Sequence, residues 1–337
     1  MKKQTRNLNY AEMVIILVIG VIAAVIPFFT KSRYWTSLGI NIFVMGAFGT
    51  AWNIIGGYAG QIGFAHSAFF SIGAYAAVIM YLKLGITPWI GMLVGAAVSV
   101  LAALFIGSIT LRFKGPYFML CTIAFTKCVE TIFTWKKDIT NGLAGMVIPI
   151  KGNHFETLIF KDTINYYYIF VVALVLALIV AWYVYHSKSG YYMRAIKADV
   201  NAAESLGIKS SKYKIMAFII SAIIVSLLGS IYAFYMAYID PTSIGGVELS
   251  TRILCFSVIG GIGNLFGPLL GAAVLTPCID FVNSIGPNGS GTLIYGVALI
   301  LIMRFRPNGL ISFIVDERGK VRFLKKREKS TEVTEHE

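Results

Sequence analysis

The stretch GGYAGQIGFAHSAFF, residues 56–70, interrupts a hydrophobic part of the chain with glycine, alanine and serine, one glutamine and one histidine. Small residues of this kind allow neighbouring helices to approach one another closely inside a membrane. Polar side chains carry a free-energy cost there unless they are hydrogen-bonded or face a cavity. The stretch therefore predicts the packed interior of a bundle of transmembrane helices, and not a surface that faces lipid.

The composition on both sides of this stretch is typical of a membrane protein. Of the 337 residues, 57% are hydrophobic and 13% are charged, whereas a soluble domain is about one quarter charged. The first apolar run is followed by TKSRYW, which is no cleavage site, so we interpret it as a spanning helix and not as a signal peptide. We expect an all-α, polytopic transmembrane bundle of about ten spans, including short or broken helices, near residues 11–30, 36–55, 61–82, 88–111, 116–134, 166–186, 213–236, 250–262, 265–283 and 290–305.

The distribution of Lys and Arg predicts the orientation of the bundle. With the N-terminus inside, 20 basic residues fall in the predicted cytoplasmic segments and 7 in the outer loops, and cytoplasmic loops are enriched in Lys and Arg. We expect a multi-pass protein of the cell membrane, with both termini cytoplasmic and a transmembrane domain over residues 1–315. Residues 316–337 are expected to form a disordered basic tail that favours anionic membrane lipid. The net charge of +13 is then a property of these segments, and nucleic acid is not an expected partner.

One predicted span is too short to cross the membrane as a simple helix. Residues 250–262 would form a helix of about 20 Å, against a hydrocarbon core of about 30 Å. The glycine-rich sequence GGIGNLFGP, residues 260–268, follows directly. The sequence therefore predicts a broken helix or a re-entrant pair over residues 250–283, buried in protein.

Four polar residues near the opening stretch are candidates for a translocation path: Asn53, Gln61, His66 and Ser67. They can instead form hydrogen bonds across helix interfaces, and for a lone buried histidine this structural role is the commoner one. Gly63, Ser67 and Ser71 are four residues apart, which predicts one helix face, and Gly263, Gly267 and Gly271 repeat the spacing. Close helix packing explains both rows.

Charged residues inside the predicted spans are functional candidates by default. Lys127 and Glu130 are three residues apart on one predicted helix, so they share a face and can pair. We place this pair and Arg252 toward the outer ends of their spans, where snorkelling or a structural ion pair explains them equally well. The four cysteines are isolated in apolar runs and no P-loop or His-Glu-x-x-His pattern occurs, so no metal, cofactor or catalytic residue is expected.

The polar segment 190–212 is predicted to form a short cytoplasmic helix between two spans. Asn201 and Glu204 have the spacing of a capping box, and Gly207 suits the left-handed position that ends a helix. Such a helix can be an ordinary surface element or a docking element for a cytoplasmic partner.

Four stretches together resemble the permease subunits of branched-chain amino acid ABC transporters, of the LivM type. They occur in the order found in that family, and the similarity covers nearly the whole chain. The stretches are GGYAGQIGFAHSAFFSIGAYAA (56–77), RAIKADVNAAESLGIKSSKYKIMAFIISA (194–222), VIGGIGNLFGPLLGAAVL (258–275) and LILIMRFRPNGLI (299–311).

The resemblance implies a permease without enzymatic activity of its own that imports branched-chain amino acids. Its expected partners are a second related permease, two cytoplasmic ATP-binding subunits that hydrolyse ATP, and an extracytoplasmic substrate-binding protein. The opening stretch corresponds to a helix that lines the path between two permeases, and segment 190–212 to the loop that couples the permease to an ATPase. The positions that match the coupling loop are Arg194, Asp199, Ala203, Glu204 and Gly207, and we expect the Ala203 face to pack against the ATPase.

Two departures from the family leave the substrate open. The family usually has an acidic residue followed three positions later by a basic one, and Lys127 and Glu130 reverse that order. The outer segment ITNGLAGM, residues 139–146, has less glycine than the family and no aspartate. A permease for urea or short amides is therefore an alternative, and so is a stand-alone secondary transporter, although few ionisable residues are expected at mid-membrane. An integral membrane enzyme ranks last, because no cluster of catalytic groups is apparent.

Overall fold

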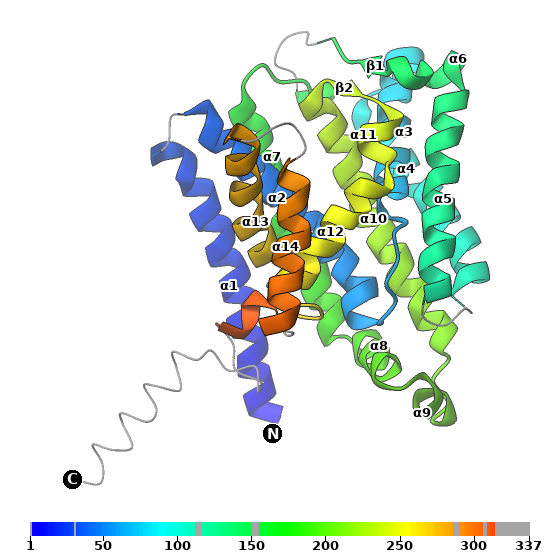
Figure 1. Ribbon diagram of the computed structural model, residues 1–337, viewed down its shortest axis with the longest axis vertical. Helices are drawn as coiled ribbons and strands as arrows, with labels where there is room; N and C mark the ends of the chain where they lie inside the picture. The colour runs from blue at the N-terminus through cyan, green and yellow to red at the C-terminus, as the bar shows by residue number, and fades with distance from the viewer. Residues whose placement is uncertain are drawn as a thin grey trace.

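Long helices lie side by side and form a bundle (Figure 1). The computed structural model describes residues 2–29, 32–111, 116–149, 155–285, 290–305 and 309–313. Its longer helices confirm the all-α polytopic fold, and they are α1 (Lys2–Phe29), α2 (Arg33–Asn53), α3 (His66–Leu84), α4 (Pro88–Thr110), α5 (Pro116–Trp135), α7 (Thr163–His186), α8 (Lys188–Ala198), α10 (Ser210–Met236), α12 (Val247–Gly260), α13 (Gly267–Ile285) and α14 (Ser290–Phe305). The shorter elements are α6 (Lys137–Thr140), α9 (Val200–Ser205), α11 (Pro241–Gly245), a π-helix (Ile54–Tyr58), three 3-10 turns (Gly142–Ala144, Phe155–Thr157 and Leu310–Phe313) and the strands β1 (Met146–Val147) and β2 (Tyr238–Ile239).

Seven of the described helices are long and apolar enough to cross a membrane. They are Arg33–Tyr58, His66–Leu84, Pro88–Thr110, Pro116–Trp135, Thr163–His186, Ser210–Met236 and Gly267–Ile285. The apolar part of α1 (Glu12–Pro27) is shorter, and so are α12 and α14. The expected number of about ten spans therefore combines full-length helices with shorter elements beside them.

Close helix contacts form the centre of the bundle, where α10 packs on α3 and α4. A Cβ on Gly73 of α3 would collide with the Ser226 carbonyl of α10, and one on Gly229 of α10 would collide with the Phe70 carbonyl of α3. Only glycine permits this approach of two backbones. A second group places α2 between α7 and α13, with α1 on the far side of α7.

The opening stretch is where the second and third spans are broken. Helix α2 continues as the π-helix Ile54–Tyr58, residues 59–65 have no helical conformation, and α3 begins at His66. We call residues 59–65 the first break. The sequence predicted one continuous helix from residue 61, with Gly63 on the same face as Ser67 and Ser71. That prediction is wrong for Gly63, because it lies in the break, where the chain makes hydrogen bonds to side chains from other helices.

The second glycine-rich region is broken as the sequence predicted. Helix α12 ends at Gly260, a turn follows, and α13 begins at Gly267. We call residues 261–266 the second break. Helix α12 begins at Val247, directly after the short helix α11, so the broken element is longer at its start than predicted. Gly263 lies in the turn with a φ of +84°, and it does not share a helix face with Gly267 and Gly271.

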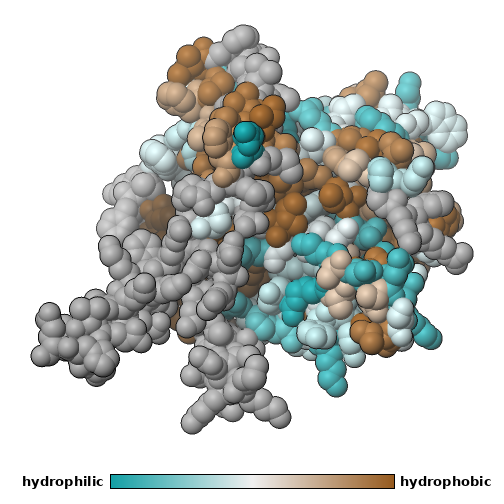
Figure 2. Space-filling model, turned by 60° about the horizontal axis from the view of Figure 1, so that its bottom comes forward, coloured by the Kyte–Doolittle hydropathy of each residue, from teal (hydrophilic) through white to brown (hydrophobic). Residues whose placement is uncertain are grey.

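The two ends of the bundle differ in structure. At one end, β1 pairs antiparallel with β2, so the loop after α5 is joined to the chain that leaves α10. At the other end lie α8, α9 and the start of α1 (Figure 1). Figure 2 shows hydrophilic residues gathered on the end that carries α8 and α9. The predicted tail over residues 316–337 lies outside the described residues.

Candidate functional site

Three of the four stretches that carry the family resemblance supply the glycines of one cluster, which we call the glycine junction: Gly57, Gly60, Gly261, Gly263 and Gly309. A Cβ on Gly309 would lie 2.5 Å from the Cα of Gly261, and one on Gly57 would lie 2.8 Å from the amide nitrogen of Gly263. The second stretch reaches the junction through Lys197, whose side chain lies against Gly60. The first and second breaks, which are about 200 residues apart in the sequence, therefore lie against each other at this junction.

Asn53 ties the two breaks together. Its Oδ1 accepts a hydrogen bond from the Gly263 amide at 2.8 Å, and its Nδ2 donates to the Asn264 carbonyl at 2.8 Å. The residue is fully buried. Both ends of the amide are thus occupied by backbone groups of the second break, which holds the last turn of α2 against it.

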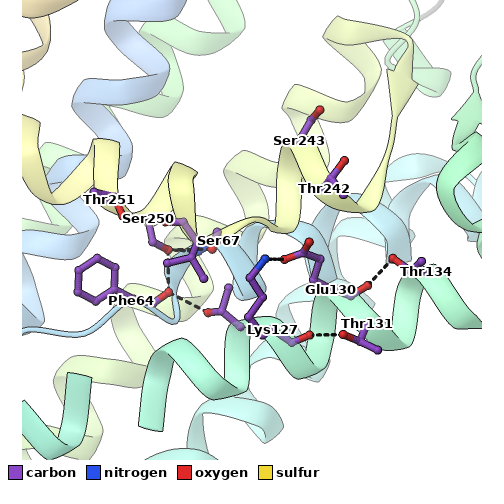
Figure 3. Close-up of polar contacts among 12 residues, drawn as sticks. Phe64, Ser67, Lys127, Glu130, Thr131, Thr134, Thr242, Ser243, Ser250 and Thr251 are labelled. Atoms are coloured by element: carbon purple, nitrogen blue, oxygen red, sulfur yellow. Dashed lines mark hydrogen bonds and ion pairs between the residues drawn. The ribbon is translucent and has the colours of Figure 1, made fainter. Parts of the chain in front are cut away.

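Hydroxyl groups surround the backbone of Phe64, in the middle of the first break. The Phe64 amide donates to Thr122 Oγ1 at 3.0 Å, and the Phe64 carbonyl accepts from Thr126 Oγ1 at 2.8 Å and from Ser250 Oγ at 2.7 Å. The Ser67 amide donates to Ser250 Oγ at 2.9 Å. Figure 3 shows this carbonyl between Ser250 and α5. Irregular backbone survives at membrane depth when it is satisfied in this way, and we call Thr122, Thr126 and Ser250 the hydroxyl collar.

His66 begins α3 directly above the first break and is fully buried. Its Nε2 lies 2.7 Å from Ser221 Oγ, and Ser221 Oγ donates to the Ala51 carbonyl at 2.7 Å. Because the serine proton is used on Ala51, Nε2 must carry the histidine proton and donate it to Ser221. Nδ1 is then a bare acceptor, and it has no hydrogen-bond partner among the described residues.

Two ion pairs lie at membrane depth beside the hydroxyl collar. Lys127 Nζ lies 2.7 Å from Glu130 Oε2 on α5, and the lysine side chain is 58% exposed while the glutamate side chain is 14% exposed. Arg252 Nη2 lies 2.6 Å from Glu248 Oε1 on α12, and both side chains are exposed. We call these four residues, with Thr131, the charged face.

The charged face lies deeper than the sequence suggested. Lys127 is about 2 Å along the axis from the midpoint of α5, at a rise of about 1.5 Å per residue. Arg252 is two residues from Ser250, which bonds Phe64 together with Thr126 of α5. The expectation that Lys127 lies toward the outer end of its span is wrong, because it lies near the middle of α5. Lys127 and Arg252 both form ion pairs, which were the predicted alternative to snorkelling.

The polar segment 190–212 contains most of α8 and all of α9. We call α8 and α9 the coupling segment, after the role that the resemblance predicts for these residues. Asp199 caps α9 by accepting hydrogen bonds from the Asn201 and Ala202 amides, so the predicted capping box starting at Asn201 is wrong by two residues. Glu204 Oε1 accepts a hydrogen bond from Ser210 Oγ. Gly207 has a φ of +82°, which confirms the left-handed position predicted for it.

The inner and outer faces of α9 are the reverse of what the sequence suggested. Ala203 is only 3% exposed and packs toward the bundle, whereas Leu206 is 82% exposed. Ala202 and Glu204 are also exposed. Arg194 is held within the chain, since its guanidinium donates to the Tyr185 carbonyl and stacks 4.0 Å from the Tyr185 ring. The face that is free for a partner is therefore the Leu206 face.

Of the residues predicted for a path, Asn53, His66 and Ser67 are fully buried, and Gln61 is half-buried in the first break. Asn53 bonds the second break, His66 bonds Ser221 and Ser67 bonds Ser250, so the three side chains have separate partners and none is exposed. The functional residues predicted from the sequence did not include the hydroxyl collar, Glu248 or Lys197. Thr122, Thr126 and Glu130 follow one another at intervals of four, and this polar row on one helix face could have been found. Ser250 carries no such signal, because its partners are more than 180 residues away.

Comparison with known proteins gives one consistent family. The model of the family described as branched-chain amino acid transport system / permease component matches residues 35–303. The permease LivM of the high-affinity branched-chain amino acid transport system of Salmonella typhimurium is 25% identical over 322 residues, which cover 89% of this chain and 75% of that protein. A probable branched-chain amino acid permease LivH of Methanocaldococcus jannaschii is 22% identical over 71% of this chain and 78% of its own length. The permease LsrC of an autoinducer 2 import system of Salmonella typhimurium is 31% identical, over 31% of each chain.

Proposed function

Since this chain belongs to the family of permease components of branched-chain amino acid transport systems, we propose that it is one membrane subunit of an ATP-driven importer of leucine, isoleucine and valine. A second, related permease completes the path. Two ATPase subunits bind at the end that carries α8 and α9, and a substrate-binding protein delivers the amino acid at the end that carries β1 and β2.

The observation that carries this proposal is the charged face. A charged side chain in contact with hydrocarbon costs at least ~2.5 kcal/mol at the helix centre, and Lys127 lies near the middle of α5 and is exposed in the single chain. Glu248 and Arg252, in the first two turns of α12, are exposed as well. A second permease that covers α5 and α12 removes this cost. The apolar side chains exposed along α4, such as Leu93, Leu101 and Phe105, face the lipid instead.

The charged face also suits an amino acid. A zwitterion carries one cation and one anion, and the face offers two carboxylates and two cations that already pair with each other. One pair can open, so that its cation binds the substrate carboxylate and its carboxylate binds the substrate ammonium, and no charge is left alone. Urea and short amides carry no ionised groups and gain less from such a surface, which ranks them below amino acids.

The energy source lies in the partner subunits. The exposed Leu206 face of α9 offers an apolar contact for an ATPase, and Gly207 turns the chain directly after it. The start of α1 lies at the same end of the bundle as α8 and α9 (Figure 1), so an ATPase at that end places the N-terminus in the cytoplasm. The basic residues of the C-terminal sequence support the same side of the membrane for the C-terminus.

Uptake into proteoliposomes tests the proposal. The permease is reconstituted with the second permease and the ATPases encoded beside it, with ATP inside the vesicles and the cognate binding protein outside. We expect accumulation of labelled leucine that needs ATP, competed by isoleucine and valine and not by urea or acetamide. Uptake that continues without ATP and stops with an ionophore would instead identify a secondary transporter. If only amides compete with the labelled substrate, the permease transports amides and not branched-chain amino acids.

A further inference from the structure

Lys197 lies near the end of α8, and its side chain extends from the coupling segment to the first break. Its Nζ donates a hydrogen bond to the Gly57 carbonyl at 2.8 Å. Gly57 belongs to the π-helix at the end of α2, where carbonyl groups lack partners within the helix and carry the negative end of the helix dipole. The ammonium therefore caps a transmembrane helix from outside it.

The glycine junction is shaped around this lysine. A Cβ on Gly60 would lie 2.9 Å from Cγ of Lys197 and 3.3 Å from its Cα, and one on Gly263 would lie 3.2 Å from its Nζ. Both glycines also have a positive φ, +70° and +84°. Glycine at both positions leaves a slot that admits the lysine stem and brings its ammonium between the two breaks.

The contact reaches both breaks and not only one. Gly57 lies four residues after Asn53, whose amide group holds Gly263 and Asn264 of the second break. A displacement of Lys197 thus acts on the segment that begins α3 and on the segment that begins α13. The ammonium is also partly withdrawn from water, and this burial lowers the pKa of Lys197 below its ordinary value.

We propose that Lys197 is the positioning residue that transmits movement of α8 and α9, driven by the ATPase, to the two breaks. The inference rests on the proposed function, because it needs an ATPase that moves the coupling segment. Coupling between two sites requires an element whose arrangement both sites bias. The lysine supplies such a link, since it is fixed to α8 by the backbone and to α2 by a charge-assisted hydrogen bond.

The test compares three variants in the reconstituted importer. Lys197→Met keeps the length of the stem and removes the hydrogen bond, Lys197→Arg restores a cation that donates, and Lys188→Met removes an exposed lysine from the other end of α8 as the matched control. Leucine uptake and ATP hydrolysis are measured on the same vesicles, together with the amount of ATPase that co-purifies. We expect Lys197→Met to assemble normally and hydrolyse ATP, with the leucine transported per ATP at least tenfold lower. Lys197→Arg should recover most of that ratio, and Lys188→Met should keep all of it.

Each other outcome overturns the inference. A normal ratio in Lys197→Met would show that the contact carries no coupling. Loss of co-purified ATPase and of uptake in equal proportion, with an unchanged ratio, would show that the lysine only stabilises the fold. If the wild-type complex itself takes up no leucine with ATP, the proposed function fails and the inference fails with it, which separates this case from the first two.

Discussion

At the scale of single residues, the polar side chains around the breaks form hydrogen bonds mainly to backbone groups. The Asn53 side-chain amide accepts a hydrogen bond from Gly263 and donates one to Asn264. Ser221 accepts a hydrogen bond from His66 and donates one to the Ala51 carbonyl. A buried polar group that has lost its partner costs about 1–3 kcal/mol. These side chains therefore act on stability first, and on transport through the position of the breaks.

We expect Asn53→Ala to destabilise the protein by about 1–3 kcal/mol, because it leaves the Gly263 amide and the Asn264 carbonyl without this partner. The measurement is the thermal unfolding of the purified protein in detergent. Ser108→Ala is the matched control, since this exposed hydroxyl bonds only within its own helix. An Asn53→Ala protein as stable as Ser108→Ala would contradict the role given to this side chain.

Replacement of His66 should affect folding and uptake together. His66→Leu removes the donor to Ser221 in a fully buried place, so membrane abundance and leucine uptake should fall in equal proportion. Ser221→Ala should lower both to a similar degree. Quantitative blotting beside uptake measures this, and uptake that falls several-fold more than abundance would show that His66 lines the path after all.

At the scale of elements, the parts that the sequence predicted are those with local signals. The short apolar run before GGIGNLFGP predicted the break between α12 and α13, and Gly207 predicted its own left-handed turn. The break over residues 59–65 was not predicted, because its small and polar residues fit a closely packed helix as well as they fit a break. It is stabilised by Thr122, Thr126 and Ser250, which lie far away in the sequence and become its partners only when the bundle packs.

The prediction of which face of α9 is exposed was wrong for a similar reason, because it too depends on contacts with other elements. Ala203 is small, and the sequence suggested a contact with a partner, whereas the fold uses the small side chain to bring α9 close to its own bundle. Which face of so short a helix is exposed depends on how α8 and α10 hold its ends. The periodicity of six residues is too brief to reveal it.

The revised α9 gives a prediction that separates docking from folding. Leu206→Asp places a charge on an 82% exposed position, so insertion and unfolding temperature should be unchanged while co-purification of the ATPase falls several-fold. Ala203→Asp buries a carboxylate without a designed partner, so the unfolding temperature and the membrane abundance should fall. If Ala203→Asp is as stable as wild type and Leu206→Asp keeps the ATPase, the assignment of the two faces is wrong.

At the scale of the whole molecule, the structure divides its outer surface by chemistry. Exposed aliphatic side chains along α4 belong against lipid, and the exposed ions of α5 and α12 belong against protein or water. The two breaks and the glycine junction lie between this charged face and the coupling segment. A movement at α8 therefore has a short physical route to the wall of the proposed path.

The accessibility of the charged face to water tests this arrangement most directly. Thr131, exposed on α5 one residue after Glu130, is replaced by cysteine in a variant whose four native cysteines are serine or alanine, and Leu101→Cys on α4 is the matched control. A thiol reacts with a polar maleimide only where it can ionise in water. In the assembled importer we predict rapid labelling of Thr131→Cys, slowed by leucine together with its binding protein, and no labelling of Leu101→Cys in the lipid. Equal protection of the two cysteines from the reagent would contradict the claim that α5 and α12 line a polar path.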